Sequence, residues 1–309
     1  MAGKVNGHKK PNCTTVHSGA GPGSSQMKPV PWSAVILSIV AVLSAAAASL
    51  VTLVWRGAFP NPSPASIGNS VLAEARGWSA ATLLVAIPLA IISLRAACRG
   101  SLRGRLIWLG ALAYFVYTYI EMGVSPPFTA LYLLYIAAFA CAIPAMVIGA
   151  ASIDIAELPV AFGKRVPRRV VAIFSILFSS LLAIAWLKSI GIRTLAGTFG
   201  WPVGEDAVRH VVHALDLGLQ VPLGVAAGAM LLRHRPAGLL VAAIMLVNGI
   251  CMGAALTAMV LCSTADAGTS AWLAAPFALV WILGVALAVV IFQSGLDVGR
   301  SGTLQPTTT

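Results

Sequence analysis

Eight long apolar runs constrain the fold of this chain more than any other feature of its sequence. They lie near residues 33–55, 78–97, 106–124, 128–151, 169–188, 207–232, 237–262 and 271–293. About 20 apolar residues in a helix span the hydrocarbon core of a bilayer. Because lipid offers backbone N–H and C=O groups no hydrogen-bond partner, such runs must be helices. The sequence therefore predicts an all-α, polytopic transmembrane helical bundle of about eight spans.

The 20 Lys and Arg residues divide unevenly between the two sides of such a bundle. If the N-terminus is cytoplasmic, the inner segments carry most of them, and the outer segments carry only Arg56, Arg76, Lys188, Arg193 and Arg209. Basic residues accumulate in cytoplasmic loops, so we expect both termini in the cytoplasm and the protein in the inner (plasma) membrane. The same clusters account for the net charge of +11 without nucleic acid, and the expected partner is the lipid bilayer.

The two ends of the chain are predicted to lie outside the transmembrane domain, which covers 32–293. Residues 1–31 are rich in Gly, Ser, Pro and Lys, and residues 294–309 are short and polar. Neither segment carries enough apolar surface to fold, so both are expected to be disordered cytoplasmic tails. The 5 cysteines show no paired spacing, which argues against a disulfide framework or a cysteine metal site.

Three prolines fall well inside predicted spans, at Pro88, Pro144 and Pro222. Each removes a helical hydrogen bond and clashes with the preceding turn, so each is expected to kink its helix. The second and sixth spans also share a spacing, because "PLAIISLRAACR" and "PLGVAAGAMLLR" place Arg at the same distance after Pro. This spacing suggests a duplication of four spans plus four, and two even halves would run parallel to each other.

The stretch "RHVVHALDLGLQVPLG" (209–224) puts polar side chains into the apolar sixth span. His210, His213, Asp216 and Gln220 fall within about 120° of arc on a helical wheel, so they share one face. Asp216 lies about 9 Å deeper in the membrane than His210. A carboxylate at that depth is costly and by default marks a functional site. Hydrogen-bonded attachment between helices is the alternative explanation.

A second polar group is predicted at the same, outer side of the bundle. The third span ends in "YFVYTYIEMG" and the fourth begins near "FTALYLLY", so these two spans hold all 5 tyrosines. Tyr117 and Glu121 are four residues apart and share a helix face. We expect an outward-opening cavity between the third, fourth and sixth spans. Its substrate- or proton-binding residues would be Asp216, His213, Glu121, Tyr117, Tyr135 and Gln220.

Most of the 8 tryptophans fall at predicted span ends. The residues concerned are Trp32, Trp55, Trp78, Trp108, Trp186 and Trp272. An amphipathic indole prefers the interface between lipid and water. We therefore interpret these tryptophans as interfacial anchors.

Metal, haem and nucleotide chemistry find little support in the sequence. His210 and His213 are weak candidates for metal ligands, because a His-x-x-His pair needs further ligands from elsewhere. Haem held between helices needs histidines on two spans, and only one span carries them. Neither a GxxxxGK[ST] phosphate loop nor a GxSxG nucleophile motif is present. No cofactor is expected.

Two segments carry a family resemblance. Trp108 to Tyr119 reads W-x-G-x-L-x-Y-F-x-Y-x-Y, and Ala214 to Leu223 reads A-L-D-L-G-x-x-V-P-L. Residues 88–140 and 211–246, which contain these segments, resemble an uncharacterised family of eight-span bacterial and archaeal integral membrane proteins. The resemblance implies the eight-span architecture and places Asp216 in a shared segment. His213 stands where the family often has Gln, which makes a histidine metal site less plausible as a family property.

The leading hypothesis is a small-solute or ion permease, or another proton-linked membrane protein, with Asp216 binding the proton or cation. An intramembrane enzyme acting on lipid-type substrates is one alternative, with His213 and Asp216 as base or metal ligands. A non-catalytic membrane sensor or assembly partner is the other, in which the polar face of the sixth span only binds another helix.

Overall fold

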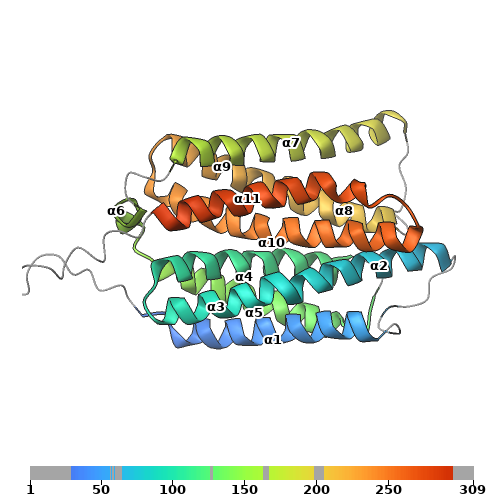
Figure 1. Cartoon of the computed structure of the whole chain (residues 1–309), viewed down its shortest axis with the longest axis horizontal. Coiled ribbons are helices and arrows are strands. Elements are labelled where there is room, and N and C mark those ends of the chain that lie inside the picture. Colours follow the sequence, from blue (N-terminus) through green and yellow to red (C-terminus); the bar gives the residue numbers. More distant parts are fainter. Residues whose placement is uncertain are drawn as a thin grey trace, which may run out of the picture.

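Helices long and apolar enough to cross a membrane make up most of the described part of the chain, as the sequence predicts. The structure is a computed structural model and describes residues 29–55, 57, 59, 65–125, 128–162, 167–197 and 205–294. In this part of the chain there are helices and no strand, and eight helices are long and apolar enough to cross a membrane. They lie side by side, and α1 begins at the end of the bundle where α11 finishes (Figure 1). The predicted tails fall almost wholly outside the described residues.

Six spans are single helices, and the second and sixth each contain a π-helical turn. The single helices are α1 (Trp32–Val54), α4 (Leu102–Val124), α5 (Tyr132–Ala151), α7 (Arg168–Leu195), α10 (Pro236–Ala267) and α11 (Ala275–Ser294). The second span consists of α2 (Ala65–Ala81), η2 (Thr82–Ala86) and α3 (Ile87–Cys98), and the sixth of α8 (Glu205–Leu215), η4 (Asp216–Gln220) and α9 (Val221–Leu232). Short helices η3 (Ile155–Glu157), α6 (Leu158–Phe162) and η5 (Ala271–Ala274) lie in the connections.

Three helices extend beyond the predicted apolar runs. α2 begins at Ala65 rather than near 78, α7 continues to Leu195 rather than 188, and α10 continues to Ala267 rather than 262. An apolar run locates the part of a helix that matches the hydrocarbon core. Its backbone hydrogen bonding continues into polar residues with adequate helix propensity, so the helix itself is longer.

The helices α4 and α10 form the centre of the bundle. In the apolar window of α4 67% of the residues are buried, and in that of α10 61%, whereas the windows of α7 and α11 are each 17% buried. Gly110 lets the two central helices approach closely, because a Cβ there would collide with Val247 of α10. Close approach through small residues is how transmembrane helices gain packing energy without a hydrophobic driving force.

The two π-helical turns occupy equivalent places in the two halves of the chain. In each turn the following N–H donates to the turn's first carbonyl: Ile87 N–H to Thr82 O, and Val221 N–H to Asp216 O. Pro88 and Pro222 come next, and each lacks an N–H and crowds the preceding turn. The wider π turn accommodates this clash, so the predicted disruption at both prolines takes the form of a π-helical turn. Pro144, by contrast, lies inside α5.

The connections that follow also repeat. The chain takes positive φ at Gly100 (84°) and at His234 (55°), just after α3 and α9. The next N–H then reaches back to the helix, from Ser101 to Ala96 O at 3.0 Å and from Arg235 to Met230 O at 2.9 Å. Both ends are Schellman-type caps, in which a left-handed residue satisfies the last carbonyls.

A tight helix crossing completes the correspondence. Gly104 of α4 faces α3, where an added Cβ would lie 2.6 Å from Ala97 N. Gly238 of α10 faces α9, where a Cβ would lie 2.8 Å from Leu231 N. Four pairs of residues correspond between the two halves, and in each the second residue follows the first by the same number of positions. They are Thr82 and Asp216, Pro88 and Pro222, Gly100 and His234, and Gly104 and Gly238. Spans two and three are therefore repeated as spans six and seven, around the central pair α4 and α10.

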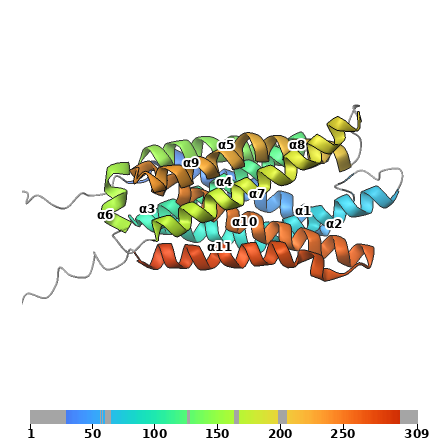
Figure 2. The same ribbon diagram turned by 90° about the horizontal axis from the view of Figure 1, so that it is seen from above.

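The first and fifth spans, however, pack differently. α1 lies along α5 and also contacts α2, whereas α7 packs mainly on α9. α7 is an outlying helix of the bundle in Figure 1 and crosses the sixth span obliquely in Figure 2. Gly224 and Gly228 make this crossing close, because Cβ atoms there would collide with Ser179 and Ile176 of α7. This GxxxG spacing is typical of tightly crossed transmembrane helices.

Candidate functional site

Asp216 is the centre of a buried polar contact between three spans. It is the first residue of the π turn η4, and its side chain is 7% exposed. A π turn adds a residue to the helix and redirects the side chains that follow it, which is why such turns occur often at functional sites. The residues around it come from α4, α7 and α8.

Two neutral donors from two other spans hold the Asp216 carboxylate. Tyr117 Oη of α4 donates to Oδ1 at 2.7 Å, and Trp186 Nε1 of α7 donates to Oδ2 at 2.7 Å. An indole N–H is only a donor, so Oδ2 must act as an acceptor in this contact. Each carboxylate oxygen therefore has a fixed partner, and the side chain is held between three spans.

Glu121 places a second carboxyl group close to this contact. It lies one turn after Tyr117 on α4, is 8% exposed, and its Oε2 has no hydrogen-bond partner in the described part of the chain. Asp216 and Glu74 of α2 are both near enough to interact electrostatically with Glu121. Like charges repel strongly away from water, so binding a proton or a cation among these groups would lower the free energy.

His213 lies beside the same contact, and His210 lies further out. The His213 side chain is buried, its ring centroid is 4.5 Å from that of Trp186, and it interacts electrostatically with Asp216. The exposed His210 has its ring centroid 6.3 Å from that of His213. Among the residues that the structure describes, no three or more His, Cys, Asp and Glu side chains are grouped so that they could hold a metal ion.

Gln220 ends the π turn and faces the central helix rather than Asp216. Asn248 of α10, a buried residue, donates from Nδ2 to Gln220 Oε1 at 3.2 Å. The polar face predicted for the sixth span therefore divides between two neighbours. His213 and Asp216 meet α4 and α7, whereas Gln220 meets α10.

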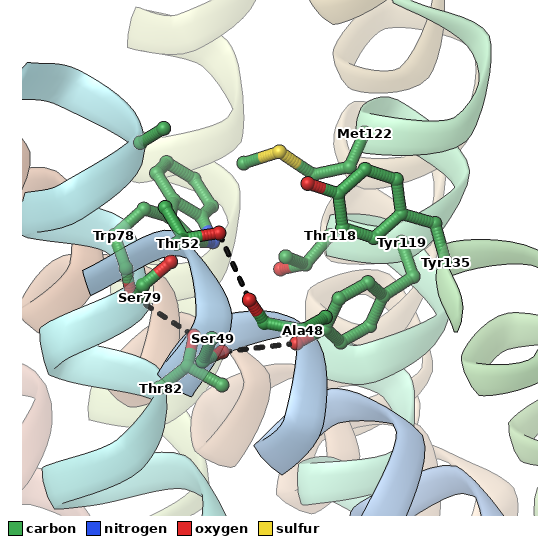
Figure 3. Close-up of a pocket in the computed structure, with 11 residues that line it drawn as sticks. Ala48, Ser49, Thr52, Trp78, Ser79, Thr82, Thr118, Tyr119, Met122 and Tyr135 are labelled. Atoms are coloured by element: carbon green, nitrogen blue, oxygen red, sulfur yellow. Dashed lines mark hydrogen bonds between the residues drawn. The ribbon is translucent and has the colours of Figure 1, made fainter. Parts of the chain in front are cut away.

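Tyr135 lies in a different place from the other predicted site residues. Its ring is 5.9 Å from that of Tyr119, and both line a cavity between α1, α2, α4 and α5. We call this the hydroxyl cavity, because most of its wall consists of hydroxyl side chains. They are Ser49, Thr52, Ser79, Thr82, Thr118, Tyr119 and Tyr135, with Ala48, Ala75, Trp78 and Met122 completing the wall (Figure 3). The single cavity expected from the sequence is thus two separate polar regions on opposite sides of α4.

The tryptophans predicted as interfacial anchors divide into exposed and internal ones, and the prediction is wrong for those that make internal contacts. Trp32 is 80% exposed and Trp272 is 70% exposed, as an anchor requires. Trp108 is fully buried, and its Nε1 donates to Ser38 Oγ at 3.1 Å. Trp186 donates to Asp216 from within α7, because that helix continues to Leu195. An apolar run that ends too early makes an internal tryptophan resemble a terminal one.

The comparisons with known proteins add no relative. The chain matches no family model, no curated protein and no solved structure. Its function is therefore inferred from the geometry around Asp216 and from the sequence.

Proposed function

We propose that this protein is a small-solute or ion permease in which Asp216 binds and releases a proton or a cation. The observation that carries the proposal is the buried Asp216 carboxylate, held by Tyr117 and Trp186 at a π turn between three spans. An ionisable group inside a membrane bundle is expensive and typically marks an ion or proton pathway. The nearby Glu121 supplies a second carboxyl group for the same task.

The helix geometry supports this role. Many transporters bind their ions at interrupted spans near an interface between repeated halves. Here the interruption is η4, and Asp216 bonds to Tyr117 of α4, which belongs to the other half of the chain. A change in the charge of Asp216 would alter contacts with α4 and α7 together. Such a group is suited to couple binding to a movement of one half against the other.

The proposal places the protein in the plasma membrane with both termini in the cytoplasm. The distribution of Lys and Arg supports this orientation. The Asp216 contact would then lie toward the outer surface, since the sixth span enters the membrane from outside.

Reconstituted vesicles test the role of Asp216 directly. Purified protein is placed in vesicles that hold a pH-sensitive dye, or a sodium-sensitive dye in a parallel set, and flux is driven by a potassium diffusion potential. We expect wild-type protein to move protons or sodium and Asp216→Asn to lose that flux. Asp266→Asn, at an exposed carboxylate near the end of α10, is the matched control and should keep it.

Folding must be measured beside the flux. Each variant should elute as the wild type does in gel filtration and keep its helical circular dichroism. A folded Asp216→Asn protein with wild-type flux of both ions would contradict the proposal.

A further inference from the structure

The hydroxyl cavity is the counterpart, in the first half of the chain, of the region around Asp216. Thr82, the first residue of η2, corresponds to Asp216, the first residue of η4. Counting back along the chain by equal steps, Ser79 corresponds to His213 and Thr52 to Trp186. Thr52, Ser79 and Thr82 all line the hydroxyl cavity (Figure 3).

The corresponding residues differ in size, and the smaller ones line the hydroxyl cavity. At these positions the second half has an indole, an imidazole and a carboxylate, whereas the first half has three small hydroxyl side chains. The remaining space has a volume of about 10 Å³, which is about what one water molecule requires. Every side chain in the wall is uncharged. The first half therefore has a polar region with space for a small molecule and no carboxyl or imidazole group in its wall.

Two buried donors in the wall make no hydrogen bond of good geometry to an acceptor in the described part of the protein. Trp78 Nε1 has no partner in the described part of the chain, and Thr118 Oγ1 has none besides a side-chain interaction with Tyr114, although Trp78 is 5% exposed and Thr118 is 1% exposed. Figure 3 shows these two side chains on opposite sides of the cavity. A buried polar group without a partner costs about 1–3 kcal/mol, and native proteins rarely leave one so. An oxygen with two lone pairs, placed between the two donors, would satisfy both.

We infer that the hydroxyl cavity binds the oxygen of a small neutral molecule, either water or a small organic solute with a carbonyl or hydroxyl group. The indole N–H of Trp78 and the hydroxyl of Thr118 donate to that oxygen. An ion is disfavoured because no charged side chain lines the wall and burial of an unpaired charge is costly. This site goes beyond the proposed function, since it needs neither Asp216 nor a coupling ion.

Nuclear magnetic resonance of the indole N–H groups tests this inference. The protein is labelled with ¹⁵N-tryptophan in detergent micelles, and the Trp78 signal is assigned by its loss in Trp78→Phe. Formamide is the neutral organic probe, and formate and methylammonium are its charged counterparts. We expect the Trp78 signal to exchange with water and to shift on addition of formamide if the cavity admits a solute. Exchange with water alone would assign the site to water.

Two variants identify the donors and the space. Thr118→Val keeps the shape of the side chain and removes its hydroxyl. The affinity of the cavity for water or formamide, measured at the Trp78 signal, should therefore fall about 2- to 10-fold. Thr52→Trp places in the first half the indole that the second half has, and should abolish the response by filling the cavity. The Trp186 signal is the internal control and should not respond, because its N–H is bonded to Asp216.

Several outcomes would overturn the inference. They are a Trp78 signal that neither exchanges with water nor shifts with formamide, a response to formate or methylammonium as large as that to formamide, and an unchanged response in folded Thr118→Val protein. Because Trp78 is read directly, failure here is distinguishable from failure of ion flux in Asp216→Asn.

Discussion

Replacing Tyr117 by Phe removes one atom, the Oη that donates to Asp216 Oδ1 at 2.7 Å, and keeps the ring. Tyr117 is 2% exposed, so solvent does not replace the lost donor. A hydrogen bond to a charged group contributes about 1.5–3 kcal/mol, and a bond between neutral groups about 0.5–1.5 kcal/mol. We expect the free energy of unfolding to fall by about 1.5–3 kcal/mol if Asp216 is ionised.

A double-mutant cycle separates this contact from other effects of the substitution. In the Asp216→Asn background the partner is neutral, so Tyr117→Phe should cost about 0.5–1.5 kcal/mol. The expected coupling energy is the difference between the two costs, about 1 kcal/mol, which lies within the range measured for polar contacts between transmembrane helices. Unfolding of the four proteins by sodium dodecyl sulfate in mixed micelles, followed by circular dichroism, gives the four free energies.

The control is Tyr132→Phe on α5, a half-buried tyrosine whose ring packs at a tilt against Phe128, with ring centroids 4.9 Å apart. Its loss should stay within about 0.5 kcal/mol, as for most substitutions away from buried contacts. A coupling energy indistinguishable from zero between Tyr117 and Asp216, in proteins that fold, would refute the assignment of this contact as the one that holds the carboxylate.

Three further predictions concern packing and orientation. Gly104→Ala should destabilise the protein by about 1–3 kcal/mol, because the new Cβ would lie 2.6 Å from the backbone of α3. Gly249→Ala is the control for thermal unfolding and should be neutral or stabilising, because no atom lies within 4 Å of its new Cβ. Trp108→Phe should cost about 1–3 kcal/mol through its buried hydrogen bond and lost volume, and Trp32→Phe, 80% exposed, should cost almost nothing in the same assay. In a variant whose only cysteine is Cys98, an exposed thiol at the end of α3, an impermeant maleimide should label inverted vesicles and spare intact cells; labelling of intact cells would reverse the proposed orientation.

The number and type of the spans could be predicted because both follow from local physics. Eight apolar runs of sufficient length allow only helices, whatever their arrangement. The repeat in spans two and six was also visible, since Pro88 and Pro222 begin the same spacing. Asp216 stood out for the same kind of reason, because a carboxylate in an apolar run is unusual in any bundle.

The partners of Asp216 depended on packing between distant parts of the chain. The sequence predicts Tyr117 as a site residue, whereas Trp186 is predicted at the membrane interface and no site role is predicted for Glu74. Trp186 meets Asp216 because α7 packs on α9 through Gly224 and Gly228 and because α7 extends past its apolar run. Hydropathy carries no information on which face of α7 turns inward.

Tyr135 and Gln220 are predicted as site residues together with Asp216, but both contact other parts of the bundle. A helical wheel predicts Gln220 and Asp216 on one face of the sixth span, yet Gln220 bonds to Asn248 of α10 and Asp216 bonds to Tyr117 and Trp186. The π turn η4 changes the angular relation between the two residues, and an α-helical wheel does not contain it. Tyr135 belongs to the hydroxyl cavity, because α4 lies between the two polar regions.

The sequence by itself determined the helices, their number, the repeated prolines and the unusual carboxylate, since each depends on residues close together in the chain. Only the tertiary structure decided which donors meet that carboxylate and that Thr52, Ser79 and Thr82 line a cavity. These outcomes depend on helix crossings, and a crossing is set by which small side chains from two separate spans come into contact.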